Sequence, residues 1–164
     1  MNRKQTFACL LLLTLSYPVH AFEVDEFKSG MSREKVKETL NSWNFDKIQD
    51  FSQETLIAFD LGSKGTNRQL VFSFCNDKLV SFEQEVKPSL KSFINTVNKF
   101  NAKYGQPSKI EADTGVISTG EKNTLALFWR NGIDTIGIRM LLLPSNDQIL
   151  LSHQTPNNCW KVPR

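Results

Sequence analysis

The segment 123–142 constrains the fold more than any other part of the chain. Two runs rich in aliphatic and aromatic residues, NTLALFWR and IDTIGIRMLL, flank Asn131-Gly132, and this arrangement is the strongest short signal for a β-hairpin. A two-residue loop at Asn131-Gly132 predicts that Trp129 pairs with Asp134. The expected pairs further along are Leu127 with Ile136 and Leu125 with Ile138. The large apolar residues then share one face: Leu125, Leu127, Trp129, Ile136, Ile138 and Met140. The hairpin therefore predicts an antiparallel sheet with one buried face.

A second hairpin is predicted over residues 68–86, with its turn at Asn76-Asp77. Two registers fit the residues. A two-residue loop pairs Phe74 with Leu79 but sets Leu70 opposite Glu83. A three-residue loop brings three apolar residues of each strand together: Leu70, Phe72 and Phe74 with Val80, Phe82 and Val86. Because a slip of one residue moves every side chain to the other face, the sequence leaves this register open.

Two amphipathic helices are predicted. Ser32 is a good N-cap for the first, and Val36, Leu40 and Trp43 follow on one helical face. The second begins near Pro88 and ends at Gly105, and it carries a long apolar stripe expected to lie on the sheet. The stripe consists of Leu90, Phe93, Ile94, Val97, Phe100 and Tyr104.

Further strands are predicted at 55–61, 109–118 and 148–153, and a loop at 62–67. The element order is then helix, three strands, helix, four strands (αβββαββββ). We expect an α+β class, with two helices packed on one face of a mostly antiparallel sheet.

Residues 1–21 have the layout of a cleaved secretory signal. Arg3 and Lys4 precede an apolar run that is too short to span a membrane, and Ala21 offers a small residue for cleavage. The prediction is a single domain of residues 22–164, exported to the periplasm or secreted, without a lipid anchor. Removing Arg3 and Lys4 leaves 18 basic and 17 acidic residues, and no basic stripe favours nucleic acid as a partner.

Cys75 and Cys159 are the two cysteines of the predicted mature chain. An even pair in an exported chain favours a disulfide. A metal pair or a redox pair is the alternative, but neither a CxxC spacing nor a neighbouring histidine supports one.

Four short motifs resemble those of small exported bacterial proteins with a β-lactamase-inhibitor-protein-like fold, the SmpA/OmlA (BamE) type. They are the Phe27–Ser32 helix opening with Val36 and Leu40, the FNAKYGQPS segment at 100–108, the turn at 76–79, and the Trp129 strand. The resemblance implies helices on one face of an antiparallel sheet and a role in binding other envelope proteins. It transfers no binding residue, and no lipobox cysteine is present to carry over membrane anchoring.

No catalytic, cofactor or metal set stands out. His153 is the one histidine of the predicted mature chain, and it is expected at a strand edge or on the surface. Glu83 and Glu85 alternate on one strand face and could act in acid–base chemistry, although a solvated edge explains them better. Trp129 and Trp160 are candidates for an exposed binding surface, because tryptophan is enriched at binding hot spots.

The sequence therefore predicts an exported, disulfide-bonded protein that acts by binding another envelope or secreted protein, rather than an enzyme. Two alternatives stay open. One is a small hydrolase that uses carboxylates or His153, and the other is a carrier that encloses a small apolar ligand between the second helix and the sheet.

Overall fold

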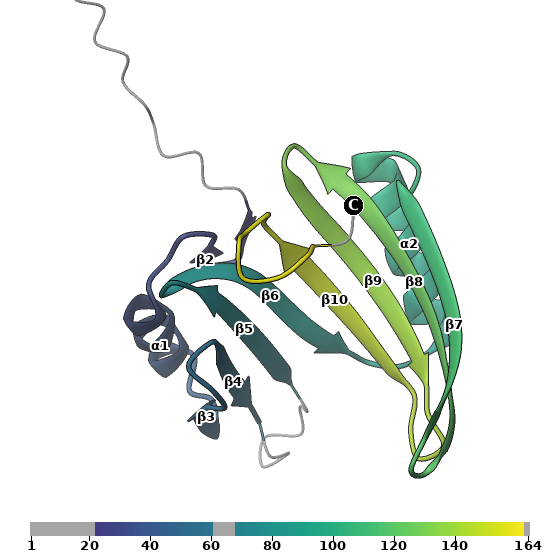
Figure 1. Cartoon of the computed structure of the whole chain (residues 1–164), viewed down its shortest axis with the longest axis horizontal. Helices are drawn as coiled ribbons and strands as arrows, with labels where there is room; N and C mark the ends of the chain where they lie inside the picture. Colours follow the sequence, from purple (N-terminus) through teal and green to yellow (C-terminus); the bar gives the residue numbers. More distant parts are fainter. Residues whose placement is uncertain (1–21, 61–67, 163–164) are drawn as a thin grey trace, which may run out of the picture.

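The computed structural model describes residues 22–60 and 68–162 (Figure 1). These residues form ten strands and two helices. The strands are β1 (Glu23–Val24), β2 (Phe27–Lys28), β3 (Lys47–Asp50), β4 (Thr55–Phe59), β5 (Gln69–Cys75), β6 (Lys78–Val86), β7 (Lys109–Ile117), β8 (Gly120–Asn131), β9 (Asp134–Leu142) and β10 (Gln148–Gln154). The helices are α1 (Arg33–Ser42) and α2 (Leu90–Tyr104). The predicted signal segment 1–21 and the predicted loop 62–67 fall on or overlap residues outside the described ranges.

Eight strands form one antiparallel sheet in the order β3-β4-β5-β6-β10-β9-β8-β7, and β1 pairs with β2 in a separate ribbon. The sheet is made of two units, each a helix followed by four strands: α1 with β3–β6 and α2 with β7–β10. Their last strands, β6 and β10, pair at the centre through six residue pairs. The first strand of each unit, β3 or β7, therefore forms an outer edge of the sheet.

The predicted α+β class is wrong, because the chain is predominantly β. Strands make up 50% and helices 19% of the residues that the structure describes. The predicted order also lacked three strands, β1, β2 and β3. The ribbon strands are only two residues long, and β3, with the sequence KIQD, has a single apolar residue. Such short polar segments carry no period-two pattern from which a strand can be predicted.

The 123–142 hairpin forms, but its register differs from the prediction. Asn131 pairs with Asp134 and Trp129 pairs with Ile136, so the loop consists of Gly132 and Ile133 rather than Asn131 and Gly132. Gly132, at φ 63°, takes the first loop position, where a type II′ turn favours glycine. Because the shift is two residues, every side chain keeps its predicted face.

The 68–86 hairpin combines the two predicted registers. The two-residue loop at Asn76-Asp77, with both residues at positive φ, pairs Phe74 with Leu79. The register then shifts by one residue, and from there Phe72 pairs with Phe82, as the three-residue loop requires. A β-bulge accommodates the extra residue. It lets a tight turn coexist with an apolar match further along the strands.

Both helices pack on the same face of the sheet, each over its own unit. Ser32 caps α1 by accepting a hydrogen bond from the Lys35 backbone N–H, and Val36 and Leu40 are completely buried. They pack on side chains of β4, β5 and β6: Leu56, Ala58, Leu70, Phe72, Phe74 and Phe82. Phe22, just before β1, and Phe27 of β2 join this cluster.

Over the other unit, α2 packs on β8, β9 and β10. Phe93 and Phe100 are buried against Leu127, Trp129, Ile136, Ile138 and Ile149. The helix ends at Gly105, whose φ of 82° suits glycine. Leu90 and Ile94 were predicted to lie on the sheet, but they are 62% and 47% exposed. The apolar stripe of α2 is therefore only partly covered.

The C-terminal segment crosses the face of the sheet opposite α2, as Figure 1 shows. The Thr155 backbone N–H donates to the Val80 carbonyl at 2.8 Å, and the Thr155 hydroxyl donates to Asp134 Oδ1 at 2.9 Å. The Sγ atoms of Cys75 and Cys159 lie 2.09 Å apart, at disulfide-bonding distance and across 84 residues of sequence. The pair that the sequence singled out therefore ties the end of the chain to β5.

Candidate binding surface

One face of the eight-stranded sheet carries no described helix, and we call it the open face. Successive side chains of a strand point to opposite faces of the sheet. The register therefore shows which side chains lie on the helix-bearing face and which lie on the open face. The open face consists mainly of Val71, Ser73, Ser81, Glu83, Glu85, Lys109, Glu111, Asp113, Lys122, Thr124, Ala126, Phe128, Thr135, Arg139, Leu141, Leu150, Ser152 and Gln154.

The middle of the open face is tightly packed. Gly137 lies between Phe128 of β8 and Ser152 of β10 in the register. A Cβ atom at position 137 would lie 2.6 Å from the Ser152 Oγ and 3.1 Å from the Phe128 ring. No side chain larger than hydrogen fits without displacing them. Glycine here leaves the space that the Phe128 ring and the Ser152 hydroxyl occupy.

Beside this packed centre, the open face has a shallow hollow of about 370 Å³ across β7, β8 and β9. Its lining residues are Glu111, Asp113, Lys122, Thr124, Ala126, Arg139 and Leu141. Two acids and two bases thus lie beside two aliphatic residues, Ala126 and Leu141. This mixture suits contact with a polar protein surface better than enclosure of an apolar ligand.

Glu83 lies towards the centre of the same face. Burial raises its pKa, while the nearby Arg139 guanidinium opposes that rise. Glu83 pairs with Ser152 and Arg139 pairs with Leu150, so the two charges lie diagonally across β10 and β9. A partly desolvated carboxylate and an arginine are positioned here to meet complementary charges.

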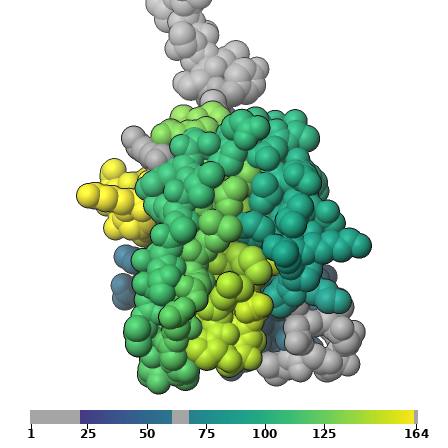
Figure 2. All heavy atoms as spheres, turned by 90° about the vertical axis from the view of Figure 1, so that its right-hand side faces the viewer, coloured from purple at the N-terminus to yellow at the C-terminus, as the bar shows by residue number. Residues whose placement is uncertain are grey.

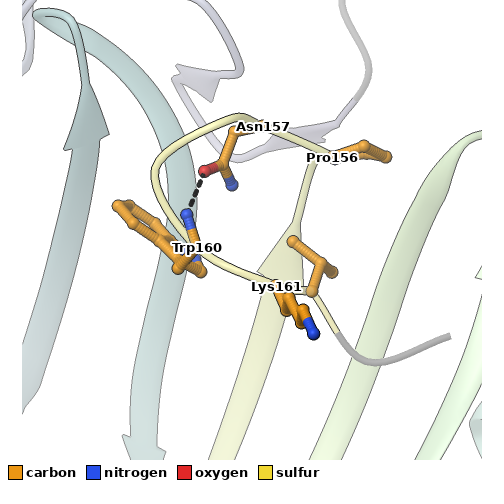
Figure 3. Close-up of a pocket in the computed structure, with 5 residues that line it drawn as sticks. Pro156, Asn157, Trp160 and Lys161 are labelled. Atoms are coloured by element: carbon orange, nitrogen blue, oxygen red, sulfur yellow. Dashed lines mark hydrogen bonds between the residues drawn. The ribbon is translucent and has the colours of Figure 1, made fainter.

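Trp160 lines a second hollow, of about 330 Å³, formed by the C-terminal segment itself (Figure 3). Its backbone N–H donates to Asn157 Oδ1 at 3.1 Å, and the same oxygen accepts from the Cys159 N–H at 2.9 Å. The Asn157 side chain thus fixes the turn next to the disulfide. Trp160 is half-buried and stays a candidate for contact.

Trp129, in contrast, is not part of any binding surface. It is 0% exposed, and its ring packs edge-on to Phe100 at 5.2 Å. Its Nε1–H donates to Asn101 Oδ1 at 3.1 Å and to the Gly105 carbonyl at 3.0 Å. The prediction for Trp129 was wrong because the buried indole finds its polar partners at the end of α2 rather than in solvent.

The residues proposed for acid–base chemistry lie on opposite faces. Glu83 and Glu85 belong to the open face, whereas His153 pairs with Phe82 on the helix-bearing face. His153 lies on a central strand and not at an edge, and its ring is 6.2 Å from that of Phe22. Burial, and then the charge of Lys103, lower its pKa to about 4. The sheet therefore keeps these carboxylates and the histidine from forming one catalytic set.

The space between α2 and the sheet is filled by protein side chains. Phe93 is 6% and Phe100 8% exposed, and the latter contacts both Trp129 and Tyr104. An apolar ligand would have to displace these rings to bind under the helix, so the geometry does not favour the carrier alternative.

In the described ranges 22–60 and 68–162, no group of three or more histidine, cysteine, aspartate or glutamate residues is arranged to hold a metal ion. Within the same ranges, neither helix has the length and apolarity needed to cross a membrane.

A family model described as the TP0088 domain matches residues 22–132. The match runs from the first described residue through β8 and ends in the β8–β9 loop. No curated protein and no solved structure matches the chain.

Proposed function

The chain belongs to the TP0088 domain family, and from this premise we propose that it is an exported envelope protein that binds another protein through its open face. The observation that carries the proposal is the difference between the two faces. One is covered by α1 and α2, and the other presents acids, bases and a shallow hollow.

The export part of the proposal has three supports. The layout of residues 1–21 is that of a signal peptide. The family match begins at residue 22, the first residue after the predicted cleavage. The Cys75–Cys159 pair is at bonding distance, and such bonds persist in oxidising compartments.

The resemblance to proteins with a β-lactamase-inhibitor-protein-like fold forms part of the same proposal. The family match identifies the TP0088 domain. The resemblance rests on the four motifs described above, among them the Gly30-Met31-Ser32 helix opening and the Tyr104-Gly105 helix end. It adds the expectation of a protein partner in the cell envelope.

Export is tested by recovering the protein from its native cells after fractionation. We expect it in the envelope or the medium, with an intact mass that corresponds to a chain beginning at Phe22. Recovery of the protein from the cytoplasmic fraction, with an intact mass that corresponds to a chain beginning at Met1, would refute export.

Binding through the open face is tested with a photo-crosslinking amino acid placed at Glu85, in the middle of that face. The matched control places it at Lys35, an exposed residue on the outer side of α1. Irradiation of living cells should give a discrete protein adduct at Glu85 and none at Lys35. Equal adducts at both positions, or none at Glu85, would contradict binding through the open face.

A further inference from the structure

We propose that β7 is a docking edge, to which an extended segment of a partner protein adds as a further strand of the sheet. The inference rests on the proposed function in one respect, namely that the partner is a protein. It names the mode of binding and the chemistry of the segment, which the open face alone does not specify.

The first observation is the length and exposure of this edge. β7 pairs with β8 on one side, and the sheet order ends with it. Its nine residues pair with β8 in an unbroken register, and all but Gly115 are exposed. The opposite edge, β3, is only four residues long. A long, regular edge without proline is the kind that accepts an added strand.

The second observation is the direction of the backbone groups. Ile117 pairs with Gly120 across a two-residue loop, and residues in that position exchange both backbone hydrogen bonds. The alternation along an antiparallel pair then turns the N–H and C=O groups of Ala112, Thr114 and Val116 away from β8. These groups form a ladder that an extended backbone can complete.

The third observation is an apolar shelf, which we define as Leu90, Ile94, Ile110, Val116 and Leu125. These side chains lie on the helix-bearing side of the sheet or on α2, and they are 62%, 47%, 63%, 89% and 38% exposed.

The shelf lies beside the edge because of the way α2 is seated. Asn101 bonds to Trp129 of β8, and Ile94 lies two turns earlier on the same side of the helix. In Figure 2, which looks onto this side, β7 and α2 lie next to each other with part of the later strands visible between them. A strand added to β7 would place every second side chain over this shelf.

The fourth observation is the charge on the other side of β7. Lys109 and Glu111 form an ion pair of 2.6 Å, so each largely satisfies the other. Asp113 is exposed next to them. A cross-strand neighbour of Asp113 is favoured when it is basic. The segment that fits is therefore extended, with apolar residues towards the shelf and basic residues towards Asp113.

The test measures binding of a fluorescent heptapeptide that alternates valine and lysine to the purified, disulfide-bonded protein. An isomer with all valines before all lysines keeps the composition and loses the alternation. A valine–glutamate version keeps the alternation and reverses the charge. We expect the valine–lysine peptide to bind tightest of the three.

Two variants examine the edge. Ala112→Pro removes one outward N–H while leaving the side chain small, and it should weaken binding by about tenfold or more, the effect of one lost backbone hydrogen bond. Ile110→Glu places a charge on the shelf and should weaken binding similarly. Its control is Ile133→Glu, in the β8–β9 loop at a comparable 59% exposure, which should leave binding unchanged. Thermal unfolding confirms that each variant is folded.

The inference would be overturned if the isomer with all valines before all lysines bound as tightly as the alternating peptide. It would also be overturned if the alternating peptide bound Ala112→Pro and Ile110→Glu as tightly as the natural protein. A dimer in sedimentation that Ala112→Pro dissolves would overturn it as well, since a second copy would then occupy β7. Flotation with anionic lipid vesicles that Ile110→Glu abolishes would assign the shelf to a membrane surface instead. Crosslinking at Glu85 is independent of all these outcomes, so the proposed function can stand while this inference fails.

Discussion

In the N-terminal half of the sheet, α1 lies over β4, β5 and β6, and the outer strand β3 is short. Arg33 of α1 binds Asp50 at the end of β3 at 2.6 Å, and Lys37 binds the same carboxylate at 2.7 Å. In the C-terminal half, α2 lies over β8, β9 and β10, and the equivalent outer strand β7 extends for nine residues, all but Gly115 exposed.

The two halves share one arrangement of a helix and four strands, but they differ in the outer strand that forms the edge of the sheet. Two basic residues of α1 hold the end of β3, and this edge is only four residues long. Among the residues that the structure describes, no ion pair joins α2 to β7, and the apolar side chains beside β7, such as Leu90 and Ile94, stay exposed. Each half thus contributes a buried core and part of the open face, and the second half adds a long exposed edge.

The largest expected effect comes from removing the centre of each core. Trp129→Ala and Phe72→Ala should each cost about 3–5 kcal/mol of unfolding free energy, since both side chains are fully buried. Because β6 and β10 join the halves, we expect one cooperative transition in each variant. Denaturant unfolding followed by fluorescence and by far-ultraviolet circular dichroism measures this.

Two separate transitions in either variant would break the comparison, because the halves would then be independent domains. Leu142→Ala serves as the control, since this side chain is 41% exposed and its loss should have little effect on stability.

The disulfide gives the next largest effect. It joins β5 of the first half to the segment that follows β10 of the second. Replacing both Cys75 and Cys159 by serine should cost about 2–4 kcal/mol, mainly because the unfolded chain is no longer constrained. Equilibrium unfolding of the variant, compared with the oxidised protein, measures the loss.

Residue-resolved hydrogen exchange of the variant with both cysteines replaced by serine shows how the loss of the disulfide is distributed between the two halves. Among amides that exchange through local opening, faster exchange should concentrate in the C-terminal segment and in β5, while those of the outer strand β7 keep their rates. Uniform acceleration of these locally opening amides would show instead that the bond supports both halves equally.

The smallest of the three effects is a pH dependence at the joint between the halves, where His153 contacts Phe22 and Phe82. Its pKa is lowered from 6.5 to about 4 in the folded protein, so the unfolded chain binds a proton more readily. Stability from the neutral ring is present above pH 6.5 and is lost as the pH falls from 6.5 towards 4.

The expected loss is at most about 3 kcal/mol over that window, and solvent access reduces it. Unfolding free energies of the natural protein and of His153→Leu, measured between pH 4 and 7, check this. The variant should lose much of the pH dependence in this range. An identical slope in both proteins would mean that His153 is as accessible to protons in the folded state as in the unfolded chain.

Local features of this fold were predictable from sequence, and features set by distant partners were not. Ser32 caps α1 as predicted, because an N-cap depends on its immediate neighbours. The faces of the 123–142 hairpin were also correct, although Gly132 rather than Asn131 opens the loop. The bulge between the two registers of the 68–86 hairpin depends on packing under α1, and no local pattern indicates it.

The candidate surface was harder to predict than the fold. Cys75 and Cys159 were paired from their number and compartment alone. Trp129 was misassigned because alternation shows which residues share a face and not which face a helix covers. The open face, the hollow and the β7 edge all follow from the pairing of β6 with β10, two strands far apart in the chain. The partial exposure of Leu90 and Ile94 has the same origin, since the seating of α2 depends on that sheet.

The position of the sulfur pair also has a consequence for biosynthesis. Cys75 emerges 84 residues before its partner, and the central strand β6 emerges long before β10. Until the last stretch has been made, the Cys75 thiol has no disulfide partner and one edge of β6 stays unpaired. A chain interrupted before β10 would keep both defects permanently, so oxidative closure acts as a check that synthesis has run nearly to the end.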